Sequence, residues 1–328
     1  MLYGSPRPSN RLMSFHADFS APGSLRAAAV THRTASLYRS AFCELTAFVA
    51  SCSSRPLTAS CSSRRVDRWL ERFAEYVYEA QGGGSYQLVV RALQGVYQEL
   101  SDHYRGRLCN IARALKGWRL LRPTESAPPL PRSWCDLLAF VIGAAGWPEA
   151  GVAILVAFDG YLRVGELLRL RVCDVLMPAR AAEFGLALHA GLRLPRTKTG
   201  RNQLARIEDP VVAGYLATMV SRFPPHSRTA LFPRMTADQL NRVLRWACTL
   251  LGLPSSFTMH SCRHGRAATA YVEGLDPESI RRAGRWASRG SLDTYLQEVS
   301  VLQYRLSAPE PLRPLLSHHK SLRAGLLL

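Results

Sequence analysis

A proline-rich stretch from Arg122 to Arg132 divides this chain into two blocks of helical pattern. It reads R-P-T-E-S-A-P-P-L-P-R, and its four prolines among few apolar residues are typical of a linker between domains. The chain has 328 residues, which is enough for two domains with separate hydrophobic cores. We therefore predict one domain at 31–121, a linker at 122–132 and a second domain at 133–308.

The first block carries the period of amphipathic helices. Apolar residues recur at three- and four-residue steps in four segments: Leu37 to Phe48, Val66 to Tyr78, Leu88 to Leu100 and Leu108 to Leu121. The pattern predicts an all-helical domain of four or five helices. Residues 1–30 are rich in Ser, Pro, Gly and Arg without a sustained period, so we predict a disordered basic tail there.

The second block is also helical, with one exception. Between Phe184 and Ile207, leucines stand on either side of P-R-T-K-T-G, which predicts a strand–turn–strand with Lys198 on or beside its tip. The apolar run from Leu137 to Phe158 is interrupted by Trp-Pro-Glu and predicts two buried helices rather than a membrane span. The fold class is therefore mainly α with a small β-hairpin or sheet (α+β). Residues 309–328 are predicted as a C-terminal tail, either packed on a neighbouring subunit or frayed.

The charge balance points to a polyanionic partner. The chain has 42 Lys and Arg against 24 Asp and Glu, a formal charge of +18. Nucleic acid, an anionic membrane and acidic proteins all fit that charge. Almost all of the basic residues are arginines, whose planar fork suits bidentate contact with phosphate. Eight cysteines occur singly without a C-x-x-C pair, and no hydrophobic leader is evident, so we expect a reduced, intracellular setting.

Three short motifs in the second block carry candidate chemistry. In L-R-V-G-E-L-L-R-L, Arg163 and Glu166 lie three residues apart; alone, such a pair is a surface ion pair. In H-S-C-R-H-G, His260, Arg263 and His264 share one helical face. A basic surface cluster is the alternative there, and the cation between the histidines disfavours a metal ion.

The third motif is G-R-W followed by a tyrosine. Trp286 precedes Tyr295 by nine residues, and in isolation both would be core residues. Taken in order along the chain, the three motifs together with R-T-K-T-G around Lys198 resemble the signature of the tyrosine recombinase (phage integrase-like) family. The resemblance spans about 140 residues, and the helical first domain is similar to the family's core-binding domain. Cys262 stands where the family usually has Leu, and Tyr304 is a reserve candidate for the nucleophile.

The resemblance implies a role for each motif residue. Tyr295 would attack a scissile DNA phosphate and form a 3′-phosphotyrosyl bond, while Arg163 and Arg263 hold the non-bridging oxygens. Lys198 would be the general acid to the leaving 5′-oxygen, and His260 would assist proton transfer or hold the phosphate.

Three further residues complete the implied site. Trp286 would donate its indole N–H and pack the tyrosine helix. Glu166 would orient the arginine or the histidine, and His264 would support the site from behind.

The implied partners follow from this chemistry. The substrate would be double-stranded DNA, clamped between the two domains, and the working unit a homo-tetramer on DNA. The reaction needs no ATP, no metal and no small-molecule cofactor, and we expect no membrane association. The arginine-rich composition and the G-R-W form favour a eukaryotic mobile element acting in the nucleus, with a bacterial cytoplasm as the alternative. Two other functions stay open: a type IB-like topoisomerase, and a catalytically inactive, mobile-element-derived DNA-binding protein.

Overall fold

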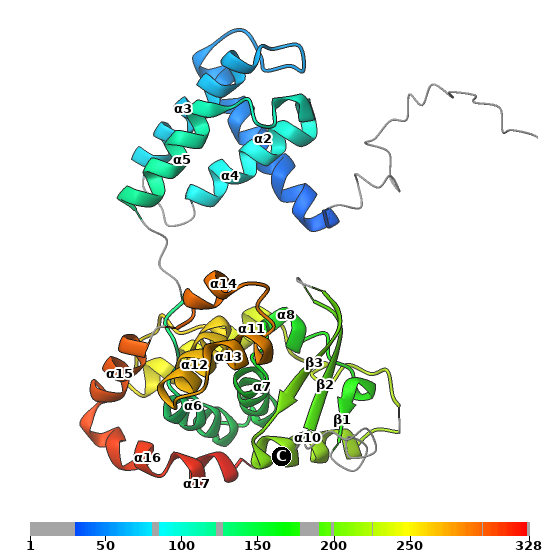
Figure 1. The fold of residues 1–328 in the computed structure, drawn as a ribbon, viewed down its shortest axis with the longest axis vertical. Helices are drawn as coiled ribbons and strands as arrows, with labels where there is room; N and C mark the ends of the chain where they lie inside the picture. Colours follow the sequence, from blue (N-terminus) through cyan, green and yellow to red (C-terminus); the bar gives the residue numbers. More distant parts are fainter. Residues whose placement is uncertain are drawn as a thin grey trace, which may run out of the picture. The chain divides into compact units, whose positions relative to one another are not determined.

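The computed structural model describes residues 30–80, 85–122, 127–177, 190–197, 200–224, 226–296 and 298–326. The chain falls into two compact units that divide between residues 124 and 125. Both are mainly helical, and a small sheet lies in the second (Figure 1). The fold class predicted from the sequence is therefore confirmed. The predicted N-terminal tail, apart from Val30, lies outside the described residues.

The first unit is built from helices alone. Its elements are α2 (His32–Cys52), α3 (Ser63–Glu79), α4 (Ser85–Gly95), the π-helical turn η1 (Val96–Leu100), the 3-10 turn η2 (Asp102–Tyr104) and α5 (Cys109–Leu121). Helix α3 buries the residues that its periodicity predicted: Val66, Trp69, Leu70, Phe73 and Val77. In α2 the buried positions are Ala41, Leu45 and Val49, whereas Leu37 is 40% exposed, so the core-facing stripe begins one turn later than predicted.

Helix α5 is held at its start by a residue from α3. Leu108, which precedes the helix, has no side chain that could cap it. Instead the buried carboxylate of Asp67 accepts hydrogen bonds from the backbone N–H groups of Asn110 (2.9 Å) and Ile111 (3.0 Å). These are N–H groups that a helix leaves unpaired at its N-terminus, so the bonds fix the two helices against each other.

The second unit combines helices with a three-stranded sheet that lies at one side of them (Figure 1). Before and within the sheet come α6 (Arg132–Ala144), α7 (Pro148–Asp159), α8 (Val164–Leu167), η3 (Val172–Asp174), β1 (Val175–Leu176), β2 (Ala190–Arg196) and β3 (Arg201–Ile207). After it come α10 (Pro210–Ser221), α11 (Ala237–Leu250), α12 (Met259–Val272), α13 (Pro277–Ala283), α14 (Arg289–Asp293), α15 (Glu298–Leu306), η4 (Glu310–Leu312), α16 (Arg313–Ser317) and α17 (His319–Ala324).

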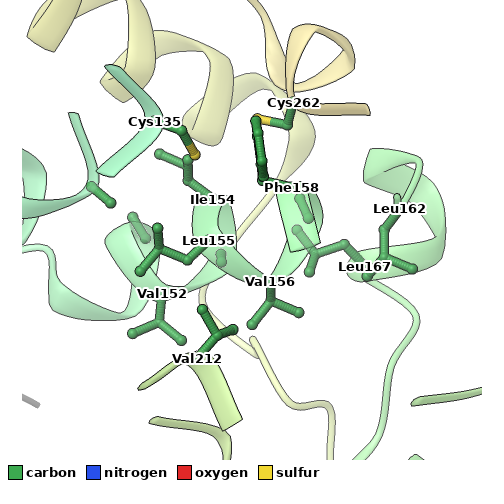
Figure 2. Close-up of a cluster of buried hydrophobic side chains, with 14 of the residues drawn as sticks. Cys135, Val152, Ile154, Leu155, Val156, Phe158, Leu162, Leu167, Val212 and Cys262 are labelled. Atoms are coloured by element: carbon green, nitrogen blue, oxygen red, sulfur yellow. The ribbon is translucent and has the colours of Figure 1, made fainter. Parts of the chain in front are cut away.

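Helix α7 forms the centre of this unit. All of its residues from Ala150 to Asp159 are buried, as expected for a helix that is apolar on every side. Figure 2 shows its side chains meeting Cys135 of α6, Cys262 of α12 and Val212 of α10. Gly146, with φ of +91°, makes the turn between α6 and α7. The prediction of two buried helices joined by a turn is confirmed.

The sheet is antiparallel with strand order β1-β2-β3. Strands β2 and β3 pair from Ala190 with Ile207 to Arg196 with Arg201, which confirms the predicted strand–turn–strand over this part. Lys198, predicted at its tip, lies outside the described residues. Strand β1 was not predicted, because two residues are too short for a period to be recognised.

Both ends of the second unit pack on its own core. Leu130, from the predicted linker, is fully buried, and its N–H donates to the carbonyl of Ser261 (3.1 Å). At the other end, the hydroxyl of Tyr215 donates to the carbonyl of Arg323 (2.6 Å), and Leu326 is 5% exposed. The described part of the predicted C-terminal tail is therefore helical and lies against its own subunit (Figure 1).

Within the described ranges, no helix is both long and apolar enough to cross a bilayer. All eight cysteines are free thiols.

Candidate active site

Seven of the eight predicted site residues come from four segments of the second unit: the start of α8, the first turns of α12, the turn after α13 and the turn after α14 (Figure 1). Arg163 directly precedes α8, and Glu166 is the third residue of that helix. The backbone N–H of Arg163 donates to Glu166 Oε2 (3.0 Å) and its guanidinium donates to Oε1 (2.7 Å). The Glu166 side chain is 1% exposed, whereas that of Arg163 is 24% exposed. The pair is thus no surface ion pair: a buried carboxylate orients an arginine that reaches solvent.

The start of α12 presents the histidines. Thr258 caps the helix by accepting from the N–H of His260 (3.3 Å). His260 is exposed, and one turn later Arg263 and His264 are buried on the same face. The rings of His260 and His264 contact each other edge to face at 4.7 Å.

Arg263 lies beneath the site. It is fully buried, and its guanidinium donates to the carbonyls of Tyr161 and Gly284, the latter at 2.5 Å. The guanidinium carbon lies 4.4 Å from the Trp286 ring centroid and 5.8 Å from that of Tyr295. The charge of Arg263 is therefore next to the tyrosine. The residue was predicted to hold phosphate oxygens directly, but here both terminal nitrogens of its guanidinium donate to backbone carbonyls.

Tyr295 completes the group. Its hydroxyl lies 3.4 Å from Nε2 of His260. Its ring stacks on His264 at 4.1 Å and meets Trp286 at 4.9 Å. Trp286 is 4% exposed, and its indole Nε1 has no hydrogen-bond partner among the described residues. A buried donor without a partner is uncommon in proteins, and this N–H is the group that the sequence analysis expected to donate to the substrate.

The reserve candidate for the nucleophile is elsewhere. The ring of Tyr304 packs on Trp134 (5.7 Å) and Phe257 (5.2 Å) in the hydrophobic core of the unit. The geometry thus favours Tyr295 over Tyr304, because only the hydroxyl of Tyr295 is placed beside His260.

Burial and positive charge set the protonation of the histidines. Although His260 is exposed as a residue, its neighbours partly desolvate its ring, and this desolvation, followed by the charges of Arg263 and Arg163, lowers its pKa. His264 is buried, and its burial, with His260 and Arg263 nearby, lowers its pKa to about 3. At neutral pH both rings are therefore neutral, and Nε2 of His260 can accept a proton from Tyr295.

Glu166 stays ionised in spite of its burial. Burial raises the pKa of its carboxyl, but the hydrogen bonds from Arg163 and the charges of Arg285 and Arg163 outweigh it, and the net pKa is lowered. A permanently charged carboxylate suits the task of holding an arginine.

Seven of the eight predicted site residues are thus placed in one group, and Lys198 lies outside the described residues. Arg285 also belongs to the group, since its side chain is 5% exposed and reaches Glu166 at 3.4 Å. The sequence offered only its position beside Trp286 as a signal. In the described ranges, no cluster of three or more His, Cys, Asp or Glu is arranged to hold a metal ion.

Comparison with known proteins shows that part of the second unit matches a known family. Residues 145–300 match the model of the phage integrase family, and this region contains every predicted site residue. The second unit therefore contains a phage integrase family domain, the catalytic domain type of the tyrosine recombinases. The resemblance indicated by the motifs is confirmed.

Solved structures share the fold at low sequence identity. One is the XerH site-specific recombinase bound to palindromic difH substrate, in a post-cleavage complex: TM-score 0.54 and 13% identity, covering 84% of this chain and 78% of that one. Another is the Tn1549 transposon integrase in complex with transposon right end DNA: TM-score 0.51 and 15% identity, covering 85% of this chain and 95% of that one. No curated protein matches the chain. At these identities the likeness concerns the fold.

Proposed function

We propose that this chain is a site-specific DNA recombinase or integrase that cuts and rejoins duplex DNA through Tyr295. The observation that carries the proposal is the placement of the Tyr295 hydroxyl 3.4 Å from His260 Nε2, next to the charges of Arg163 and Arg263. The match of residues 145–300 to the phage integrase family supports the same reaction class.

The first step would be a transesterification. Oη of Tyr295 attacks the scissile phosphorus as its proton passes to Nε2 of His260, which is neutral at neutral pH. A P–Oη bond forms and the P–O5′ bond breaks, leaving a 3′-phosphotyrosyl link. The departing 5′-oxygen takes a proton to become a hydroxyl, and family resemblance assigns that proton to Lys198. In the second step a 5′-hydroxyl attacks the same phosphorus and Tyr295 recovers its proton.

The charge that develops on the phosphate needs donors close by. Arg163 is held by Glu166 while part of its guanidinium stays exposed, so it can bind a non-bridging oxygen. The unpartnered indole N–H of Trp286 is the second donor. Arg263 acts at longer range, through its charge beneath the tyrosine ring.

The partner in this proposal is duplex DNA, bound by a clamp to which the first unit contributes, with a tetramer as the recombining assembly. The charge of +18 supports contacts to the phosphate backbone. Because the bond energy is retained in the phosphotyrosyl link, the proposed reaction requires neither ATP nor a divalent metal.

The test uses nicked duplexes from which a short cleaved fragment diffuses away, so that the covalent intermediate accumulates. A pool derived from the DNA flanking the protein's own gene is incubated in EDTA with wild type, Tyr295→Phe and Tyr304→Phe. We expect a protein–DNA adduct on a denaturing gel for wild type and Tyr304→Phe, and none for Tyr295→Phe.

Other outcomes select the alternatives. DNA binding without any adduct would indicate an inactive DNA-binding protein. Relaxation of a supercoiled plasmid that lacks a recombination site would indicate a topoisomerase. Cleavage that EDTA abolishes would indicate a metal-dependent nuclease.

A further inference from the structure

Arg285 is a buried cation in a constrained backbone. Its side chain is 5% exposed, and its φ of +59° lies in the left-handed region. A non-glycine residue rarely adopts that region, which costs it about 1–2 kcal/mol. A residue that keeps such a conformation is held there by its surroundings, and such positions gather at functional sites.

The guanidinium of Arg285 braces the loop before Arg163. It donates to the carbonyls of Gly160 (3.2 Å) and Tyr161 (3.1 Å). These residues lie three and two positions before Arg163. Tyr161 itself has a φ of +50°, and its carbonyl also accepts from Arg263. Two buried arginines therefore converge on one carbonyl of this loop.

The same guanidinium reaches the carboxylate that orients Arg163. Nη2 of Arg285 lies 3.4 Å from Glu166 Oε2, the oxygen that also accepts the backbone N–H of Arg163 at 3.0 Å. The other oxygen, Oε1, accepts the guanidinium of Arg163 at 2.7 Å. Glu166 is thus held between a buried cation on one side and a partly exposed cation on the other.

In this arrangement Arg285 and Arg163 have different roles. A buried carboxylate with one partner is free to follow that partner, whereas a second, rigid partner fixes its position. Arg285 is too buried to bind DNA itself: its side chain is 5% exposed, and both terminal nitrogens of its guanidinium donate to protein atoms. It can act only through Glu166 and the loop.

We propose that Arg285 is a positioning residue, which locks Glu166 and the 160–163 loop so that the guanidinium of Arg163 is fixed toward the scissile phosphate. Its activity consequences rest on the proposed function, and its structural consequence does not.

The structural arm of the test is hydrogen exchange at the Arg163 amide in the full chain. In Arg285→Gln, Oε2 of Glu166 is released, so we expect this amide to exchange about fivefold to tenfold faster, as for the loss of one hydrogen bond. The Arg171 amide is the internal reference, because it donates to Asp174 (3.1 Å) in the same i,i+3 geometry without any contact to Arg285. Equal exchange of the Arg163 amide in wild type and variant would overturn the inference.

The activity arm separates positioning from a general loss of structure. Adduct formation is measured on duplexes with a normal scissile phosphate and with an uncharged methylphosphonate in its place. On phosphate, Arg285→Gln should be slower by about a hundredfold, the effect of misplacing a group by about 1 Å. On the methylphosphonate the charge that Arg163 neutralises is absent, so the defect should fall to a few-fold. An equal defect on both substrates would show that Arg285 only maintains the fold, and would overturn the proposal.

Two further variants keep the result interpretable. Arg282→Gln removes an arginine of the same segment whose side chain is 76% exposed and pairs with Glu278, and it should change neither readout. Arg285→Lys keeps the charge without the fork that spans the carbonyls and Glu166, so it should give an intermediate defect and replaces Arg285→Gln if that variant does not fold. If wild type forms no adduct with either substrate, the proposed function fails while the exchange result alone decides the role of Arg285.

Discussion

The glycine that ends the H-x-x-R-H-G motif is predicted to be required for packing. A Cβ on Gly265 would overlap the carbonyl oxygen of Leu130 and lie 2.7 Å from its carbonyl carbon. Carbon atoms in contact are about 3.5–4.0 Å apart, so the Leu130 backbone would have to move by about 1 Å. Leu130 is fully buried and its N–H donates to Ser261, so the movement would disturb the core and this hydrogen bond.

The size of the effect follows from opposing contributions. Overpacking of this kind costs about 1–3 kcal/mol, and a weakened hydrogen bond adds about 1 kcal/mol. Alanine in place of a helical glycine returns about 1 kcal/mol through helix propensity. We expect Gly265→Ala to destabilise the second unit by about 2 kcal/mol, or about 5 °C in melting temperature for a domain of this size.

Gly214→Ala is the matched control, because Gly214 also lies inside a helix, and a Cβ there would meet nothing within 4 Å. This variant should be more stable than wild type by about 0.5–1 kcal/mol. Urea unfolding of the full chain, followed by hydrogen exchange of α12, reports the second unit separately. If Gly265→Ala gained stability as Gly214→Ala does, the proposed contact between α12 and the linker end would be refuted.

Three further predictions concern the site. His260 accepts a proton only when neutral and its pKa is lowered from 6.5, so the acid limb of the cleavage rate against pH should have its midpoint below 6.5 and vanish in His260→Gln; a limb on the alkaline side would instead identify a general acid. His264 has a pKa of about 3 when folded, so the unfolded chain binds the extra proton and stability should fall as pH drops from about 6.5 toward 3, by at most about 1.4 kcal/mol per pH unit; the slope should flatten in His264→Gln, and an equal slope in both proteins would contradict this. Trp286→Phe keeps the ring and removes the unpartnered N–H, so adduct formation should fall about tenfold or more while the unfolding midpoint changes little; a loss of stability without a change in rate would assign the indole to packing alone.

The sequence predicted what depends on periodicity. The buried stripe of α3 follows from apolar residues at helical spacing, and the strand pair from leucines at alternate positions. The site motifs could be grouped from their order along the chain, because family resemblance supplies the contacts between distant segments that spacing alone does not.

Other features depend on contacts that no local pattern encodes. Leu326 is buried because it packs against two glycines, Gly143 of α6 and Gly151 of α7, which leave room for its side chain. The burial of Arg285 depends on the left-handed turn at its own backbone, and the full burial of Arg263 depends on two carbonyls from separate loops. These positions could be recognised only once the segments were seen together.

The most direct test of the account is to identify the amino acid that becomes attached to DNA. The adduct trapped on nicked duplexes is digested with protease and nuclease, and the peptide that carries the nucleotide is sequenced by mass spectrometry. The account predicts a single modified peptide with the nucleotide on Tyr295. A nucleotide on Tyr304 or on any other residue, or intact DNA binding without an adduct on a substrate that contains the recombination site, would contradict it.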